Sequence, residues 1–241
     1  MRPAFRHPVL GRYDVQYFQC GTCGLLQTET PYWLEEAYAS AIACADTGIV
    51  ARNIYLSRVA AAVFWRLFRG QGSFLDAAGG YGLFTRLMRD IGFDCYWSDP
   101  HAQNLVARGF EDAAHAGPYT AVTAFEVLEH LLDPLAFLSD LMRERGARTL
   151  LISTELFAGA APEPASWWYY AFDTGQHISF YRRSTLEEIG RRLGLRLYSH
   201  RSVHLWTDRR FSPTHLRLLS EPRLAALMAW PARLRLQSRK R

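Results

Sequence analysis

The chain has 241 residues, of which 49% are hydrophobic and 21% are charged, and its formal net charge is +5. This length and composition are typical of one globular α/β domain with additions at its ends. No apolar run is long enough to span a membrane, and the N-terminus lacks the apolar core of a signal peptide, so we expect a cytoplasmic protein without a transmembrane segment.

The excess positive charge is concentrated at the C-terminus. The last eleven residues contain five basic side chains and no acid, and the rest of the chain is formally neutral. A nucleic-acid-binding domain usually spreads its basic residues over a folded face, so this distribution argues against a nucleic-acid partner. Two interpretations of the tail stay open: a solvated terminus, or contact with an acidic partner or a membrane surface.

The expected elements follow one another along the chain. Residues 1–50 are irregular and rich in aromatic residues, and a helix is expected over 31–45. Apolar spacing and glycine stops then predict alternating helices and strands. The helices are expected over 53–69, 83–91, 103–109, 134–146 and 184–194. The strands are expected over 73–78, 94–99, a short stretch near Phe110, 119–131 (running into a turn), 148–154, 195–200 and 203–208.

Strands that alternate with helices indicate a mostly parallel sheet with helices on both faces, and the last two strands indicate a closing hairpin. In such a sheet, ligands bind outside the carboxyl ends of the strands. The loop over 155–181 is too long for a simple connection, so we expect it to be functional.

A glycine-rich turn follows the first strand of the alternating region. Ala78, Gly79, Gly80 and Gly82 are small enough for the backbone to turn sharply and to approach a ligand closely. No Gly-Lys-Ser/Thr follows, so the turn is not a P-loop, and its glycine spacing differs from the NAD-binding fingerprint. Asp76 carries a charge that would repel a pyrophosphate, and it favours a cationic or amine-bearing ligand instead.

This segment resembles the first motif of the class I S-adenosylmethionine-dependent methyltransferases, in which an acid is followed by three glycines at alternate positions. Asp76, Gly80 and Gly82 match the motif, and Ala78 replaces the first glycine. The replacement adds one methyl group where the family's backbone approaches its cofactor.

Three further segments carry the same resemblance. Asp99 ends the next strand, as the acid of the family's second motif does. Residues 119–134 resemble the strand-four motif, and residues 175–194 resemble the segment after strand five in the small-molecule branch, which includes sugar C-methyltransferases and ubiquinone-type methyltransferases. The resemblance covers residues 55–207. It implies a Rossmann-like class I methyltransferase fold with a mostly parallel seven-stranded sheet, and S-adenosylmethionine as the cofactor.

The resemblance also implies which residues bind the cofactor. Asp99 would bind both ribose hydroxyls, Phe125 and Glu126 would line the methionine end, and Arg52 is a candidate partner of the cofactor carboxylate. The full set is Arg52, Asp76, Ala78, Gly80, Gly82, Asp99, Pro100, Phe125 and Glu126.

The sulfonium of this cofactor is already an activated electrophile, so the protein mainly aligns the acceptor and, where a proton must leave, supplies a base. His177 lies in the long loop that covers the acceptor pocket in this fold, and His130 lies at the same sheet edge. We expect His177, or else His130, to be the base or to orient the acceptor, with a structural role as the alternative. The N-terminal aromatic residues form either a lid or plain core. The expected substrate-binding residues are Trp33, Tyr38, Trp168 and Tyr169.

Two groups of residues are candidate metal sites. Glu126, Glu129 and His130 have the spacing of a divalent-metal site in ubiquinone-type O-methyltransferases, although the same pattern also occurs in relatives where no metal is expected. Cys20 and Cys23 resemble half of the zinc-binding segment of some sugar C-methyltransferases. A full zinc site needs four ligands, and the chain has no second pair of this kind. We therefore expect no metal at either place.

These expectations divide the chain into an N-terminal cap segment with half a zinc knuckle (1–52), an S-adenosylmethionine-binding methyltransferase domain (53–208) and a C-terminal basic helical tail (209–241). They predict methyl transfer to a small-molecule acceptor, with a sugar or polysaccharide precursor as one candidate. The alternatives are a non-catalytic binding module that recruits a partner, and a nucleic-acid methyltransferase. The neutral body and the missing Asn/Asp-Pro-Pro-Tyr/Phe motif disfavour the last of these.

Overall fold

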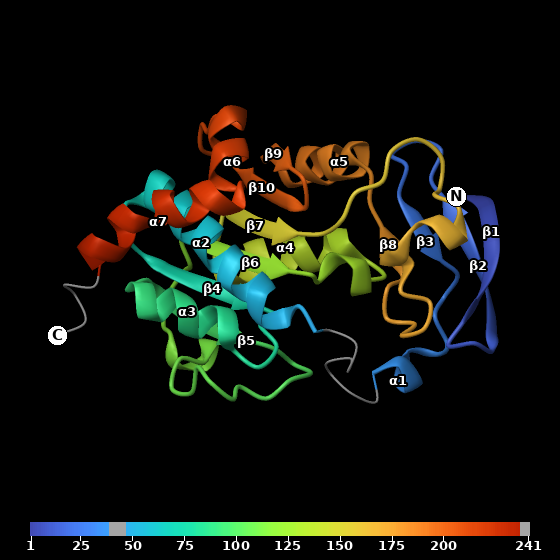
Figure 1. Cartoon of the computed structure of the whole chain (residues 1–241), viewed down its shortest axis with the longest axis horizontal. Helices are drawn as coiled ribbons and strands as arrows, with labels where there is room; N and C mark the ends of the chain where they lie inside the picture. Colours follow the sequence, from blue (N-terminus) through green and yellow to red (C-terminus); the bar gives the residue numbers. More distant parts are fainter. Residues whose placement is uncertain (39–46, 237–241) are drawn as a thin grey trace.

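The computed structural model describes residues 1–38 and 47–236, which form two β-sheets with helices around the larger one (Figure 1). The larger sheet has the strand order β5-β4-β6-β7-β10-β9 and the smaller has the order β1-β2-β3-β8. The strands of the larger sheet are β4 (Ser73–Ala77), β5 (Asp94–Ser98), β6 (Ala121–Phe125), β7 (Thr149–Ser153), β9 (Arg196–His200) and β10 (Val203–Thr207). The strands of the smaller sheet are β1 (Arg2–Val9), β2 (Tyr13–Gln19), β3 (Leu26–Thr28) and β8 (Ser179–Phe180).

Helices cover both faces of the larger sheet, and each face has its own apolar core. Side chains of α2, α3, α6 and α7 fill one core, and side chains of α4 and α5 fill the other. Within the described residues, no helix is both long and apolar enough to cross a bilayer. The helices are α1 (Leu34–Ala37), α2 (Ile49–Phe68), α3 (Leu83–Ile91), α4 (Pro134–Arg145), α5 (Arg183–Leu193), α6 (Pro213–Leu219) and α7 (Pro222–Leu236).

The strand directions confirm the predicted sheet. β4, β5, β6 and β7 pair in parallel, and β10 runs antiparallel to both β7 and β9, as the expected closing hairpin requires. Every residue of β7 and of β10 is buried, because both faces of the sheet are covered. The carboxyl ends of β4 and β6 therefore meet at one edge, where this class of sheet binds its ligands.

Two expected elements are missing after β5. The stretch near Phe110 makes only a single bridge, between Trp97 and Glu111, so the described sheet has six strands where seven were expected. Residues 103–109 are not helical. Asn104 explains the second difference: its side chain accepts from the N–H of Ala107 and donates to the carbonyl of the same residue, which replaces helical hydrogen bonds.

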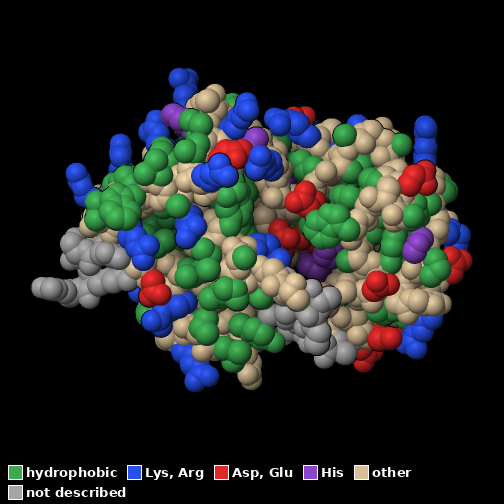
Figure 2. All heavy atoms as spheres, in the orientation of Figure 1, with side chains coloured by type: hydrophobic (Ala, Val, Ile, Leu, Met, Phe, Trp, Pro, Cys, Tyr) green, Lys and Arg blue, Asp and Glu red, His purple; other side chains and the backbone are tan. Residues whose placement is uncertain are grey.

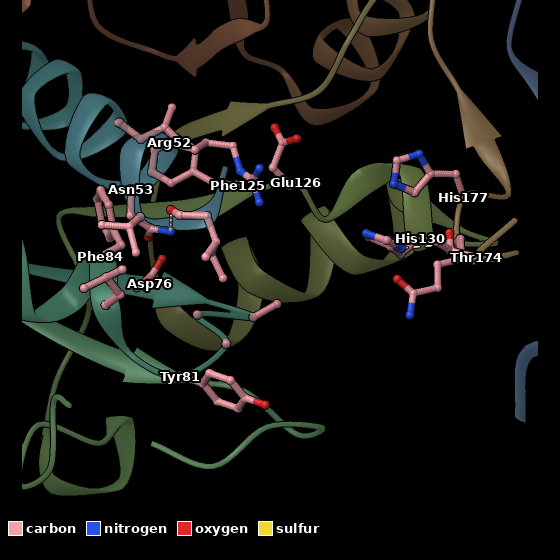
Figure 3. Close-up of a pocket in the computed structure, with 18 of the residues that line it drawn as sticks. Arg52, Asn53, Asp76, Tyr81, Phe84, Phe125, Glu126, His130, Thr174 and His177 are labelled. Carbon is pink, nitrogen blue, oxygen red and sulfur yellow. Dashed lines mark hydrogen bonds between the residues drawn. The ribbon is translucent and has the colours of Figure 1, made fainter. Parts of the chain in front are cut away.

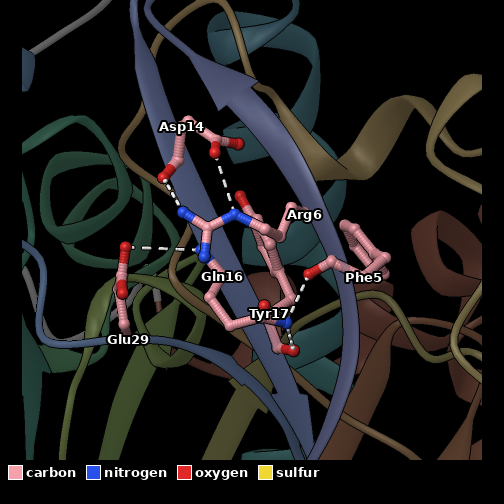
Figure 4. Close-up of polar contacts among 6 residues, drawn as sticks. All are labelled: Phe5, Arg6, Asp14, Gln16, Tyr17 and Glu29. Atoms are coloured by element: carbon pink, nitrogen blue, oxygen red, sulfur yellow. Dashed lines mark hydrogen bonds and ion pairs between the residues drawn. The ribbon is translucent and has the colours of Figure 1, made fainter.

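The N-terminal region is a sheet and not the irregular segment that we expected. β1 and β2 form an antiparallel hairpin, in which the Gln16 side chain donates to the carbonyls of Phe5 and Tyr17, and Arg6 pairs with Asp14 (Figure 4). The helix expected over 31–45 appears as the short α1, and residues 39–45 of that prediction lie outside the described residues.

β8 belongs to the long loop after β7, yet it pairs with the N-terminal strand β3, with Leu26 opposite Phe180. Aromatic side chains from both segments share one core, in which Tyr17, Tyr170 and Phe180 are fully buried. The cap segment and the long loop are thus one unit, and this unit lies beside the carboxyl edge of the larger sheet (Figure 1).

The C-terminal region is also folded. α7 packs on α2, and Leu236 at its end is buried. Residues 231–236 are therefore helical and not frayed, although Arg233 and Arg235 remain exposed to solvent. The remaining residues of that expected tail, 237–241, lie outside the described residues.

Candidate active site

A cavity of about 660 Å³ opens where β4 and β6 end (Figure 3). Its volume lies within the range of small-molecule sites. Most of the predicted site residues line it, namely Tyr38, Arg52, Asp76, Ala78, Gly80, Phe125, Glu126, His130, Trp168, Tyr169 and His177. They come from the start of α2, the turns after β4 and β6, and the long loop after β7.

Asp76 lies at the floor of the cavity and is only 3% exposed. Its two carboxylate oxygens accept hydrogen bonds from the hydroxyls of Thr85 (3.1 Å) and Thr123 (3.0 Å). Burial raises the pKa of Asp76 to about 7, against the opposing effect of these two bonds, and the nearby charge of Asp99 adds to the rise. A positively charged group bound in the cavity would stabilise the ionised carboxylate.

The glycine turn has one position that is open to the cavity. At Gly80, with φ of +54°, an added Cβ would meet no protein atom within 4 Å. At Gly79 an added Cβ would lie 2.6 Å from Asp76 Oδ2, so that glycine is required by packing. Ala78 also has a positive φ, of 55°, a conformation that costs free energy for a residue with a side chain. The turn thus leaves room for a ligand against the backbone of Gly80.

Three predicted cofactor residues lie beside the cavity and not on its wall. Gly82 precedes α3 with φ of +86°, in the left-handed region, and Pro100 is exposed. Asp99 is held by backbone N–H groups: Gly80 donates to Oδ2 at 2.8 Å, and His101 and Ala102 donate to Oδ1 at 2.7 and 3.0 Å. Asp99 therefore fixes the glycine turn directly, while its role toward ribose stays a prediction.

We expect Asp99→Ala to weaken cofactor binding by at least about tenfold, because hydrogen bonds to a charged acceptor contribute roughly 1.5–3 kcal/mol each. Calorimetry with S-adenosylhomocysteine measures the affinity, and circular dichroism checks the fold. Asp90→Ala is a matched control, since Asp90 is an acid on the neighbouring helix α3 that does not line the cavity. Equal affinity of the Asp99 variant and the wild type would disprove the assignment.

His177 and His130 lie next to each other at one side of the cavity, with ring centroids 4.9 Å apart (Figure 3). His177 Nδ1 donates to the carbonyl of Tyr169 at 2.7 Å, and His130 Nδ1 donates to the carbonyl of Gln176 at 3.1 Å. A carbonyl can only accept, so each ring keeps its Nε2 as a lone-pair acceptor. The structure thus brings the two predicted bases together.

Both imidazoles are neutral over the physiological pH range. Burial lowers the pKa of His177 to about 3, and the neighbouring His130, when protonated, and the charge of Arg52 lower it further, against the bond to Tyr169. Burial likewise lowers the pKa of His130 to about 4, against its bond to Gln176. Each ring is therefore neutral and has an available lone pair, but the low pKa makes it a weak base, and the cation formed on proton transfer needs a counter-charge nearby.

Glu129 is the nearest buried acid to the two rings. It is fully buried, its Oε1 accepts from the hydroxyl of Tyr169 at 2.6 Å, and its Oε2 has no hydrogen-bond partner. Burial raises the pKa of Glu129 to about 7, against the bond from Tyr169. Glu129, His130 and His177 each offer one possible metal-ligand atom, and these three atoms lie within 4.8 Å of one another.

This cluster differs from the metal set that the sequence suggested. Glu126, the first member of that set, hydrogen-bonds with Ser153 and is not part of the cluster. Among the described residues, no cluster of three potential ligands contains Cys20 or Cys23. Backbone N–H groups of Cys23 and Thr22 lower the pKa of Cys20 to about 7 despite some burial. The absence of metal at both places stays a prediction.

Trp33 is the one predicted substrate residue that the structure removes from the site. It is 1% exposed in the core of the smaller sheet, and its indole N–H donates to the carbonyl of Gly175 at 2.8 Å. Trp33 therefore anchors the loop that carries His177. Tyr38 does reach the cavity, with its hydroxyl 3.0 Å from His130 Nδ1, and Trp168 is 77% exposed at the rim.

The sequence analysis missed several polar residues of the site. Asn53, Tyr81, Thr174 and Gln176 line the cavity. Tyr81 could have been found, because it stands inside the glycine turn. The two threonine partners of Asp76 could not, because Thr123 is 47 positions away along the chain.

A family model described as a methyltransferase domain matches residues 51–200, which is more than half of the chain. The chain belongs to this methyltransferase family. Its fold is the class I methyltransferase fold, and its methyl donor is S-adenosylmethionine. The open wall at Gly80 and the buried acid Asp76 fit such a donor, which carries an ammonium group and no phosphate.

Solved structures are similar to this methyltransferase in fold. TnmH has a TM-score of 0.51 at 19% identity, over 73% of this chain and 60% of its own. The magnesium protoporphyrin IX methyltransferase ChlM from Synechocystis PCC 6803, with bound SAM, has a TM-score of 0.41 at 17% identity, over 73% of this chain and 90% of its own. At this identity the likeness to TnmH shows the fold alone. No curated protein matches the chain.

Proposed function

We propose that this methyltransferase acts on a small-molecule acceptor whose nucleophilic atom loses a proton during the transfer. The observation that carries the proposal is the pair of neutral imidazoles, His130 and His177, at one end of the cavity whose other end is the glycine turn. A base and a methyl-donor site in one cavity are what such a reaction needs.

Different residues of the chain bind the donor, bind the acceptor and accept the proton. The bound donor supplies an electrophilic methyl group. The turn at Gly80 and the side chains of Asp76 and Arg52 bind at the donor end, and Trp168 and Tyr38 lie at the acceptor end. His177 accepts the acceptor's proton at Nε2, since its Nδ1 is already bonded to Tyr169.

Glu129 then stabilises the imidazolium. Its unpartnered Oε2 is buried beside both rings, where a carboxylate has no competing water and a positive charge would be costly on its own. His130 can take the same role as His177, because its Nε2 is equally unengaged by any backbone group.

For the acceptor class we propose a polyhydroxylated molecule such as a sugar or polysaccharide precursor. Hydrogen-bonding side chains of Asn53, Thr174 and Gln176 and the aromatic rings of Tyr81 and Trp168 line one cavity, which suits a ligand with hydroxyl groups and apolar faces. We propose the cytoplasm as the place of action, where the close thiols of Cys20 and Cys23 would stay reduced.

The test is methyl transfer from S-adenosylmethionine with a labelled methyl group to a fractionated metabolite extract. We expect label in the sugar-containing small-molecule fraction, with the product identified by mass spectrometry. The His130→Ala/His177→Ala double variant should bind the donor and transfer little label. Label in the nucleic-acid or protein fraction would contradict the acceptor class. Donor binding without transfer to any fraction would favour a non-catalytic binding module.

A further inference from the structure

The C-terminal helix α7 has its large apolar side chains on the side that faces solvent. The side that faces the protein carries mainly alanine: Ala225, Ala229, Ala232 and Leu236 are buried. The opposite side carries larger residues with high exposed fractions: Leu227 (66%), Trp230 (57%) and Leu234 (60%). At 3.6 residues per turn these three fall within a stripe roughly 60° wide, directly opposite the buried side. An ordinary surface helix has the reverse arrangement.

The packing of α7 fixes this orientation. A Cβ added at Gly70 would lie 2.8 Å from a methyl carbon of Leu236, and a Cβ added at Gly92 would lie 2.7 Å from Leu236 Cβ. The end of α7 therefore sits directly on two glycine backbones. Ala225, Ala229 and Ala232 bring the rest of the helix close to α2 in the same way. The apolar stripe cannot turn inward without breaking this contact.

Within α7, basic residues border the apolar stripe, and the helix itself contains no acid. Arg233 and Arg235 flank it on its two sides, and Arg223 lies at its start. Glu221 is the last acidic residue of the whole sequence, and residues 237–241 add three more basic residues. In Figure 2 a group of hydrophobic side chains with arginines around it covers the end of the molecule where α7 lies.

We propose that this face of α7 binds the surface of a bilayer that contains anionic lipids. An apolar stripe with tryptophan, bordered by arginine, is the pattern of helices that lie in the headgroup region. The arginine side chains reach lipid phosphates while their stems and the leucines remain in the apolar boundary. The stripe lies on the outside of a helix, and neither of the two main cavities of the described residues is lined by α7. A broad, deformable surface therefore fits it better than a partner that needs a groove.

Charge also separates a bilayer from a second copy of the chain. Two such faces brought together would place arginine against arginine, with no acid after Glu221 to compensate. An anionic bilayer would instead place negative charge opposite these arginines. The inference does not depend on the acceptor, because α7 lines no part of the catalytic cavity.

The test is co-sedimentation of the full chain with vesicles of phosphatidylcholine alone or with phosphatidylglycerol. We expect binding to the anionic vesicles only, weakened by salt. The Leu227→Ser/Trp230→Ser and Arg223→Glu/Arg233→Glu double variants should each weaken binding by roughly tenfold or more. The matched controls are Leu132→Ser and Arg108→Glu, which change exposed side chains elsewhere and should bind like the wild type. Calorimetry with S-adenosylhomocysteine checks that every variant is folded.

Three results would overturn the proposal. The first is no binding of the wild type to anionic vesicles, and the second is binding by both double variants that equals that of the wild type. The third is a concentration-dependent dimer in sedimentation velocity that the Leu227→Ser/Trp230→Ser variant abolishes, which would make this face an interface between copies of the chain.

Discussion

Gly80→Val should abolish the binding of both S-adenosylmethionine and its demethylated product. Gly80 lines the cavity, and the added side chain would meet no protein atom within 4 Å of its Cβ. The protein can therefore accommodate the new carbons only at the ligand's expense. Calorimetry with each of the two ligands measures the loss.

The control variant must introduce the same backbone strain at a glycine that does not line the cavity. Gly80 has φ of +54°, which a β-branched residue adopts only at a cost. Gly159 has φ of +74°, also has no atom within 4 Å of an added Cβ, and does not line the cavity. Gly159→Val should bind the donor normally and lose comparable stability. Normal donor binding by Gly80→Val would mean that the cofactor lies elsewhere.

His177→Ala should lower the turnover rate by roughly 10²–10⁴-fold, the usual contribution of a general base. Donor affinity should stay within a few-fold, because His177 lies at the far side of the cavity from Asp76 and Tyr81 (Figure 3). Steady-state rates and calorimetry separate the two quantities. If His130→Ala alone gives this pattern, the roles of the two rings are exchanged. A lower melting temperature with unchanged turnover would make His177 structural.

The pH dependence gives an independent check on the base. An ordinary histidine takes up its proton near pH 6.5, and a rate that depends on it falls there. The lowered pKa of His177, about 3, instead keeps the ring neutral as the pH falls through 6.5. We therefore expect no loss of rate from imidazole protonation until the pH approaches 3. The Glu129 carboxyl takes up its proton nearer pH 7. Any change in rate around pH 7 should therefore be smaller in the Glu129→Gln variant than in the wild type.

The core of the fold could be predicted because its signals are local. The strand ending at Ala77, the turn at Gly80 and the strand ending at Ser98 are adjacent in sequence, and each has its own apolar pattern or turn residues. The N-terminal sheet could not be predicted in the same way. Its short strand β3 is completed by β8, more than a hundred residues away, and no local pattern reports such a pairing.

The candidate site, like the fold, could be predicted from the sequence only in part. The family motif indicated Asp76 and Asp99, and both lie at or beside the cavity. Trp33 has the residue type of a lid, but its indole N–H is used by a backbone carbonyl in the core. The lowered pKa of His177 depends on burial by the folded loop, which sequence spacing cannot measure.

The pairing of β3 with β8 also bears on how the chain is made. Gln27 and Ser179, which pair across these strands, are 152 positions apart. At roughly 5–20 residues per second, β3 leaves the ribosome on the order of 10 s before its partner exists. For that interval the hairpin presents an open strand edge, which is a template for aggregation. The nascent chain therefore has a period of vulnerability that ends only when β8 docks, and a chaperone that covers the N-terminal hairpin during synthesis should raise the yield of folded protein.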